Sequence, residues 1–255
     1  MPHPMGKIIV FANQKGGVGK TTTAVNLGAY LAEAGKRVLL VDFDPQSNTS
    51  SSVGARKDAP GIYDVIMGKV PAERAIQPCS VPNLSIIASS IDLTGATVEL
   101  VNQEKREYFL KRSLLPLAKT FDYIFIDCPP SLGLLTLNGL VAADSVIIPL
   151  QCEYFALEGL SLLLKTVSRV QKGLNTGLKI GGILFTMYDS RTRLANDVVQ
   201  EVTGYFKEKV FRTIIPRNVR LSEAPSFAKP ISQYDRECIG ARSYQKLAEE
   251  VLLNA

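Results

Sequence analysis

The sequence predicts an α/β fold in which one mostly parallel, twisted sheet carries helices on both faces. Apolar runs typical of buried strands alternate along the chain with segments of helical periodicity. A glycine-rich turn directly follows the first apolar run and precedes the first helical segment. The length of 255 residues suits one large domain, and no linker or repeat divides it. We therefore expect a single domain over residues 1–255.

The expected strands are short apolar runs bounded by polar or turn-forming residues. In chain order they cover residues 8–12, 38–41, 84–87, 123–126, 146–150, 180–186 and a short run at 213–215. Helical periodicity predicts helices over residues 21–34, 110–118, 134–143, 157–170, 196–206 and 242–253, and Gly35 is the expected cap of the first of them. The stretch 48–64, rich in serine, glycine and charge, predicts a mobile loop.

The glycine-rich turn is Lys-Gly-Gly-Val-Gly-Lys-Thr-Thr at residues 15–22. Backbone N–H groups of such a loop cradle phosphates, and the helix that follows adds positive potential at its N-terminus. Lys20 would reach the β- and γ-phosphates, and the Thr21 hydroxyl would bind Mg²⁺. The loop thus predicts a nucleoside triphosphate site built by Lys15, Gly16, Gly17, Val18, Gly19, Lys20, Thr21 and Thr22.

This loop departs from the ordinary phosphate-binding pattern. That pattern requires glycine where the chain has Gln14, and the chain instead has an additional lysine, Lys15, at the loop entrance. A solvent-exposed lysine without a role is the plain alternative for Lys15. The glycine spacing of dinucleotide-binding loops is not met either.

Carboxylates end two of the predicted strands, where α/β sheets bind their ligands. Asp127 follows an apolar strand and enters a proline-stiffened turn, which fits a carboxylate that holds Mg²⁺ through a water molecule. Asp42 and Asp44 follow another strand, and a period of two places them on one side. Asp44 should lie further out, near the γ-phosphate. Asp42 is either part of the Mg²⁺ shell or a structural carboxylate.

Composition and charge limit the partners. The hydrophobic content of 46% and charged content of 21% are those of a soluble globular protein, and no apolar run reaches the roughly 20 residues of a membrane span. The four cysteines are widely spaced, which favours reduced thiols in a cytoplasm over a metal site. Residues 165–220 hold eleven Lys and Arg against four Asp and Glu, so a polyanionic partner is expected there.

Longer motifs carry a family resemblance. They are A-N-Q-K-G-G-V-G-K-T-T-T-A-V-N-L, V-L-L-V-D-F-D-P-Q, I-D-C-P-P-S-L, E-Y-F-A-L-E-G-L, T-M-Y-D-S-R-T and I-P-R-N-V-R-L-S-E-A-P-S, and they span residues 12 to about 227. On these motifs the chain resembles the ParA/Soj-type chromosome-partitioning ATPases, which have the deviant Walker A loop of the ParA/MinD superfamily. The last three motifs are the most specific to this branch.

The resemblance implies a slow ATPase with Mg²⁺ that forms a homodimer around two ATP molecules. Lys15 would cross to the partner's nucleotide, and Asp44 would position the attacking water. The adenine would lie between Met187 and Pro216, beside Arg217 and Asn218. The resemblance also implies a ParB-type partner that accelerates hydrolysis, and a cytoplasmic, nucleoid-associated location.

Double-stranded DNA, bound without sequence preference, is the polyanion that the resemblance implies. Arg191 and Arg220 align with the DNA-contacting arginines of the family, and Lys207, Lys209 and Arg212 would widen the patch. The plain alternative is a solvated basic face. About seven residues precede the first strand, too few for a helix-turn-helix, so no separate operator-reading domain is expected.

Two related functions compete with this interpretation. A MinD-like membrane ATPase needs a C-terminal amphipathic helix with a basic face, whereas residues 240–255 contain Glu249 and Glu250 and have an uncharged end, so we expect a helix packed on the sheet and no membrane partner. A nitrogenase-type iron protein would bridge a cluster across a dimer with two cysteines per chain. Cys128 and Cys152 each follow a strand and are the candidates for that role.

Overall fold

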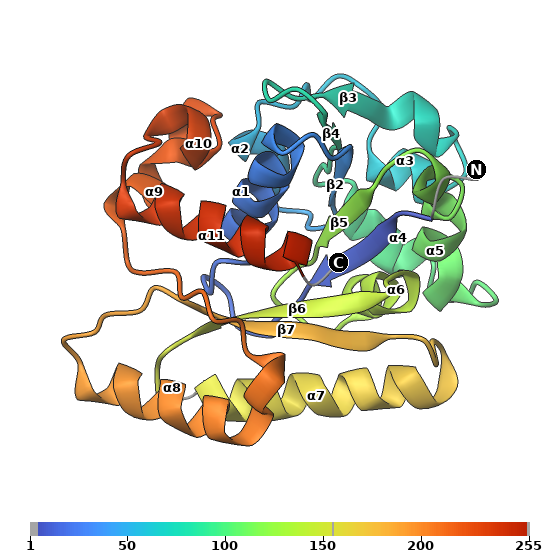
Figure 1. Cartoon of the computed structure of the whole chain (residues 1–255). Helices are drawn as coiled ribbons and strands as arrows, with labels where there is room; N and C mark the ends of the chain where they lie inside the picture. Colours follow the sequence, from blue (N-terminus) through green and yellow to red (C-terminus); the bar gives the residue numbers. More distant parts are fainter. Residues whose placement is uncertain (1–4, 155, 254–255) are drawn as a thin grey trace.

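The computed structural model describes residues 5–154 and 156–253 and shows a central sheet between two layers of helices (Figure 1). The described residues form one seven-stranded sheet in the order β3-β4-β2-β5-β1-β6-β7. The strands are β1 (Lys7–Phe11), β2 (Val38–Asp42), β3 (Ile76–Pro78), β4 (Leu84–Ile87), β5 (Tyr123–Asp127), β6 (Ser145–Gln151) and β7 (Lys179–Thr186). Every pairing is parallel except that of β3 with β4, so the predicted α/β class is confirmed.

Helices cover both faces. They are α1 (Lys20–Glu33), α2 (Asn48–Ser52), α3 (Ile62–Ile66), α4 (Leu93–Glu99), α5 (Phe109–Leu114), α6 (Leu134–Ala142), α7 (Ala156–Gly173), α8 (Arg193–Phe206), α9 (Val219–Glu223), α10 (Ile231–Tyr234) and α11 (Ile239–Leu253). Side chains of α1 and α11 build the core on one face, and those of α3 to α8 build the core on the other. Each core consists mainly of aliphatic side chains removed from water, which is the main stabilising contribution to the fold.

The strand register places the functional ends together. Phe11 at the end of β1 and Asp42 at the end of β2 both pair with Asp127 at the end of β5. The glycine-rich loop follows β1, which lies between β5 and β6 near the middle of the sheet. The loop and both carboxylates therefore meet at the carboxyl edge of the central strands, as open α/β sheets require of a ligand site.

Two predicted elements are wrong. Residues 213–215 form no strand, because the Arg212 and Thr213 amides donate to the Glu250 carboxylate at 2.7 and 3.0 Å instead of continuing a ladder. The stretch 48–64 is only partly a loop, because it contains α2 and α3. Composition gave no sign of α2, since its serine and threonine hydroxyls find buried partners that only the fold provides.

Other boundaries differ by smaller amounts. The predicted helix 110–118 ends as α5 at Leu114, and a separate 3₁₀ turn covers Leu117–Lys119. Pro116 lies between the two and has no N–H to continue an α-helix. The antiparallel strand β3 and the helices α4, α9 and α10 were not predicted, and all of them are short.

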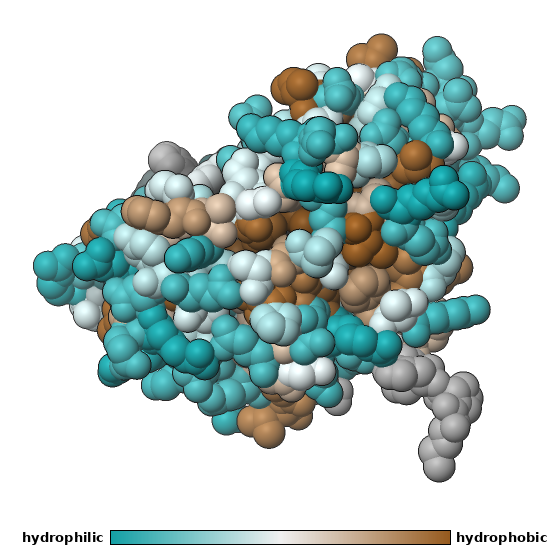
Figure 2. Space-filling model, turned by 90° about the horizontal axis from the view of Figure 1, so that it is seen from above, coloured by the Kyte–Doolittle hydropathy of each residue, from teal (hydrophilic) through white to brown (hydrophobic). Residues whose placement is uncertain are grey.

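The C-terminal helix α11 packs against α1 with its apolar side. Tyr244, Leu247 and Val251 are buried in one core with strand residues such as Ile9 and Tyr123, so the predicted packing of this helix on the sheet is confirmed over Ile239–Leu253. Residues 254 and 255 lie outside the described residues. None of the helices that the structure describes is long and apolar enough to cross a membrane. On the face seen in Figure 2, hydrophilic side chains prevail and the hydrophobic ones gather in a few places.

Candidate functional site

The glycine-rich loop has the backbone conformation that its glycines allow. Gly17 and Gly19 have φ of +70° and +83°, in the left-handed region where a side chain would be strained. Gly19 caps α1, whose fourteen residues start at Lys20. The Thr186 hydroxyl donates to the Val18 carbonyl at 2.9 Å and ties the loop to β7. The N-terminus of α1 thus lies behind a fixed loop, which favours an anion.

Lys20 is held in the loop by the loop's own backbone. Its ammonium group donates to the Lys15 carbonyl at 3.0 Å. Burial lowers the pKa of Lys20, and the Asp127 carboxylate partly opposes that shift. A buried cation next to the backbone amides of a helix N-terminus is a suitable site for phosphate oxygens.

A cavity of about 400 Å³ opens above the loop. It is lined by Gly16, Gly17, Gly19, Lys20, Thr21, Thr22, Asp44, Gln46, Asn48, Ser51, Ser52, Pro130, Met187 and Pro225. Asp44 is the one strand-end carboxylate among these lining residues. Its Oδ1 accepts the Gln46 amide at 3.0 Å, so the carboxylate is oriented by its own turn. Asp44 is therefore placed to contact a ligand directly.

Asp127 lies under the cavity floor and is fully buried. Its Oδ2 accepts the hydroxyls of Thr21 and Thr49, each at 2.6 Å. Its Oδ1 is buried and has no hydrogen-bond partner in the described residues. Burial raises the pKa of Asp127 to about 6, against the effect of the two hydroxyls. An unpartnered buried carboxylate oxygen is costly unless a ligand completes it.

The arrangement fits Mg²⁺. No three His, Cys, Asp or Glu side chains converge as a metal cage within residues 5–154 and 156–253. Mg²⁺ is usually held by one or two protein oxygens, waters and substrate phosphates rather than by such a cage. The Thr21 hydroxyl and the unpartnered Oδ1 of Asp127 are suitable oxygens for that mode.

The Asp42 carboxylate is held by hydrogen bonds from the residues that follow it in the chain. Its Oδ2 accepts the Ser50 amide at 2.8 Å and the Ser50 hydroxyl at 2.6 Å, while its Oδ1 accepts the Asp44 amide at 3.2 Å. Burial, together with the nearby Asp127 charge, raises the pKa of Asp42 to about 7. Both of its carboxylate oxygens already accept hydrogen bonds from the chain, unlike Oδ1 of Asp127, so the structural alternative fits Asp42 better than a place in the Mg²⁺ shell.

Lys15 does not line the cavity of its own chain. Its side chain lies beside α7, where a β-carbon built on Gly159 would be 3.7 Å from Cε of Lys15. The lysine at the loop entrance is therefore directed away from the phosphate site that Lys20 serves.

A smaller cavity of about 180 Å³ adjoins the first and shares Gly19, Thr22, Met187 and Pro225 with it. Its other lining residues are Thr186, Ile215, Pro216, Arg217, Asn218, Leu221, Ser222 and Tyr244. The four predicted adenine-site residues thus lie together. Sequence reasoning missed Pro225 and Tyr244, and nothing local in the sequence marks them because separate segments bring them here.

The predicted DNA residues fall into two sets. Arg191 and Arg220 lie on segments joined by a backbone bridge between Tyr188 and Pro216, next to the cavities. Lys207, Lys209 and Arg212 follow the opposite end of α8 and line a groove of about 820 Å³ with Glu250. The fourteen residues of α8 separate the two sets by about 20 Å.

Both arginines of the first set form exposed ion pairs. Arg191 contacts Asp189 through Nη2–Oδ2 and Nε–Oδ1 distances of 2.7 and 2.9 Å, and its side chain is 86% exposed. Arg220 contacts Glu223 at 2.9 Å and Asp235 at 3.3 Å. Exposed pairs of this kind contribute little free energy, so a phosphate can replace the carboxylate at small cost.

The two candidate cluster cysteines are core residues. Cys128 is 1% exposed, and a β-carbon on Gly139 would lie only 2.6 Å from its sulfur. Burial raises the pKa of both thiols, that of Cys152 to about 12. A cluster shared across a dimer needs thiolates at the surface, which these positions do not supply.

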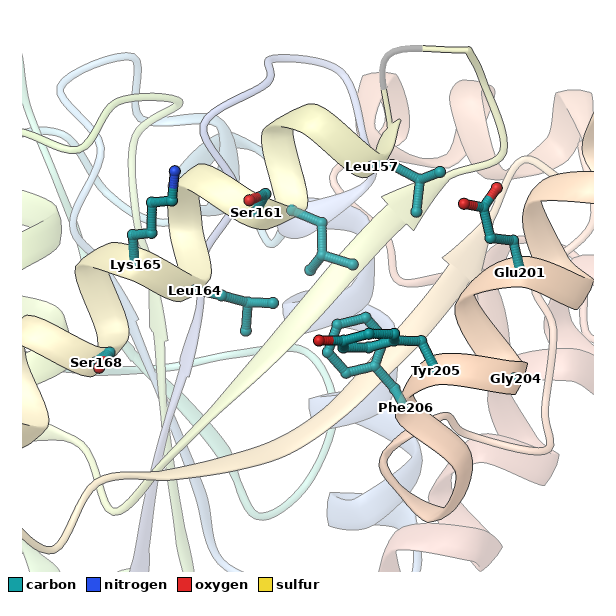
Figure 3. A pocket seen from close by; sticks show the side chains of 10 residues that line it. Leu157, Ser161, Leu164, Lys165, Ser168, Glu201, Gly204, Tyr205 and Phe206 are labelled. Carbon is teal, nitrogen blue, oxygen red and sulfur yellow. The ribbon is translucent and has the colours of Figure 1, made fainter.

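A further cavity of about 620 Å³ lies between α7 and α8 (Figure 3). Leu157, Leu164, Tyr205 and Phe206 extend into it, with Lys165 and Glu201 at its margins (Figure 3). None of the predicted site residues lines this groove.

Known proteins are similar to this chain in sequence and in fold. Residues 6–180 match the family model AAA_31, described as an AAA domain. The chromosome-partitioning ATPase Soj of Treponema pallidum is 64% identical over 97% of this chain and 98% of the relative. The sporulation initiation inhibitor protein Soj of Bacillus subtilis is 57% identical over 98% of this chain and 100% of the relative.

The fold comparison agrees. Cobyrinic acid a,c-diamide synthase from Mycobacterium smegmatis, solved with an ATP analogue and magnesium, superposes with a TM-score of 0.86 at 41% identity over 97% of this chain and 94% of that chain. Its ligands are those that the loop, Thr21 and Asp127 fit here. The phosphate loop, the hydroxyl–carboxylate pair and the near full-length identity together establish that this chain belongs to the Soj/ParA family of chromosome-partitioning ATPases.

Proposed function

We propose that this protein is an ATP-dependent dimer that binds DNA without sequence preference and, with a ParB-type partner, drives the segregation of chromosome or plasmid origins. The observation that carries the proposal is that the cavity above the glycine-rich loop lies next to Arg191 and Arg220. The phosphate cavity and the arginines of the first set occupy neighbouring segments beyond the carboxyl ends of the strands.

Mg²⁺-ATP is the ligand that the cavities favour. The triphosphate would lie on the loop, with Lys20 at the β- and γ-phosphates and the base in the smaller cavity between Met187 and Pro216. The metal ion would neutralise phosphate charge, with the Thr21 hydroxyl and Asp127 holding it. Asp44 lines the cavity and would orient the attacking water, because positioning dominates phosphoryl transfer.

Lys15 is proposed to act in the partner's site. Its side chain lies beside α7 rather than in its own cavity, which suits a cation that serves a second copy. In a face-to-face dimer it would offset the charge that develops at the bridge between the β- and γ-phosphates. ATP would then favour the dimer because only the dimer offers this contact.

DNA binding is proposed to depend on the nucleotide because ATP promotes formation of the dimer. A dimer doubles each arginine, and arginine contacts phosphates through planar donors. Backbone contacts give affinity without sequence readout and strong salt dependence. The membrane alternative finds less support, because the apolar stripe of α11 formed by Tyr244, Leu247 and Val251 is buried on the side that packs against α1.

The test compares binding to an arbitrary DNA duplex with ATP, with ADP and without nucleotide. We expect ATP-dependent binding that is lost in Arg191→Glu, while that variant still dimerises with ATP in sedimentation. Equal binding in all three nucleotide states would refute the coupling. Strong preference for one operator sequence, or sedimentation with anionic liposomes in place of DNA, would refute the proposed partner.

A further inference from the structure

The short helix α2 holds two buried carboxylates of the site, those of Asp42 and Asp127. It follows the Asp44 turn directly, and its second and third residues are Thr49 and Ser50. Thr49 is fully buried and donates to Asp127 at 2.6 Å. Ser50 is nearly buried and donates to Asp42 at 2.6 Å. The same helix presents Asn48, Ser51 and Ser52 to the phosphate cavity.

Hydrogen bonding at Asp127 is asymmetric. The Thr21 and Thr49 hydroxyls donate to the same oxygen, Oδ2, whereas Oδ1 has no partner in the described part of the chain. Each hydroxyl has a single proton, so two donors occupy the two lone pairs of Oδ2. The oxygen that remains for a ligand is Oδ1.

A carboxylate needs such contacts to keep one orientation. The torsion that rotates the carboxylate of an aspartate is broad and shows weak intrinsic preference. The Thr21 hydroxyl is itself a candidate ligand of the metal, so its direction depends on what occupies the site. Thr49 is fully buried and is not among the residues that line the cavity, so its hydroxyl, which donates to Asp127, is not a candidate ligand of the metal.

We infer that Thr49 is a positioning residue that holds the Asp127 carboxylate so that Oδ1 is the oxygen left to bind Mg²⁺, directly or through a water molecule. This inference rests on the proposed Mg²⁺-ATP site. Thr49 belongs to the segment that directly follows Asp44, so the metal-holding carboxylate and the water-orienting carboxylate are fixed by one stretch of chain. Mutation of a residue that hydrogen-bonds to a metal-binding carboxylate, without itself touching the metal, typically lowers metal affinity by 10- to 100-fold.

The experiment uses Thr49→Val, which keeps the shape of the side chain and removes the hydroxyl, and Thr49→Ser, which restores it. Calorimetry measures the affinity of a non-hydrolysable ATP analogue in EDTA and across a Mg²⁺ titration. We expect Thr49→Val to raise the half-saturating Mg²⁺ concentration by about 10-fold. The affinity in EDTA should stay unchanged, and Thr49→Ser should resemble the parent.

The matched control is Thr136→Val. Thr136 is equally buried, but its hydroxyl donates to the Ser131 carbonyl at 2.7 Å and not to a carboxylate. We expect this control to leave the Mg²⁺ titration unchanged. Circular dichroism verifies that each variant is folded.

Three results would overturn the assignment. Thr49→Val could match the parent, Thr49→Ser could fail to restore Mg²⁺ affinity, or Thr49→Val could weaken analogue binding equally in EDTA, which would mean a structural role for α2. A parent protein that binds the analogue without any response to Mg²⁺ would instead refute the proposed metal site itself. The titration of the parent protein therefore tests the proposed Mg²⁺-ATP site, and the titrations of the variants test the role of Thr49.

Discussion

Replacing Arg191 by alanine should halve the salt dependence of DNA binding. The side chain is 86% exposed, and its contact with Asp189 is a surface ion pair that contributes little to stability. If each subunit of a dimer neutralises two phosphates through Arg191 and Arg220, four are neutralised in all. The slope of log K against log salt is then about −3.6, and removing Arg191 from both subunits leaves about −1.8.

The assay is fluorescence anisotropy of a labelled arbitrary duplex with ATP, at several salt concentrations. Arg193→Ala is the matched control, because Arg193 is a neighbouring arginine with an exposed side chain in an ion pair with Asp197. We expect the control to keep the parent slope. An unchanged slope in Arg191→Ala, or an equal reduction in Arg193→Ala, would refute the placement of the DNA surface.

Three further predictions concern the site and the core. Asp44→Ala should reduce phosphate release by about 100-fold while an ATP analogue still binds, since Asp44 orients water rather than holding the triphosphate; near-parent turnover would contradict that role. Gly139→Ala should lower the free energy of unfolding by about 1–3 kcal/mol in urea titrations, because the new β-carbon would lie 2.6 Å from the Cys128 sulfur, and an unchanged midpoint would mean that the core yields there. The pKa of Asp127 is about 6 in the folded protein against 3.8 when unfolded, so the folded protein binds this proton more tightly. The resulting stabilisation of the nucleotide-free protein is full below about pH 4 and is lost as the pH rises through 6. Asp127→Asn should therefore be more stable than the parent at pH 8 in urea, by up to about 3 kcal/mol, and a less stable variant would contradict this sign.

The phosphate loop and its strand were predictable because their information is local. The turn requires glycine at the positions where the backbone is left-handed, and the helix must start immediately afterwards. The position of Asp127 at the end of a buried strand was also predictable, since an apolar run leads directly into it and two prolines follow closely; its role in holding Mg²⁺ stays a prediction.

Elements whose partners are distant in the sequence were missed. The residues of α2 are polar enough to predict a loop, and the partner that takes the Thr49 hydroxyl inward is Asp127, 78 residues further along the chain. The run 213–215 was apolar enough for a strand, but Glu250 of α11 accepts the amide of Thr213 in the run and that of Arg212 just before it. In both places a side chain far along the chain competes for the backbone or the hydroxyls, and the local pattern does not indicate it.

The sequence by itself determined the α/β class, the loop that accepts phosphates and the family of the chain, because each rests on short motifs or on the periodicity of apolar residues. The tertiary structure decided which carboxylate faces the cavity, that Asp42 is bound by Ser50, that Lys15 turns away from its own site, and that the basic residues divide into two sets. These are matters of direction and distance between segments, which follow from how the strands are ordered and packed and not from the residue types alone.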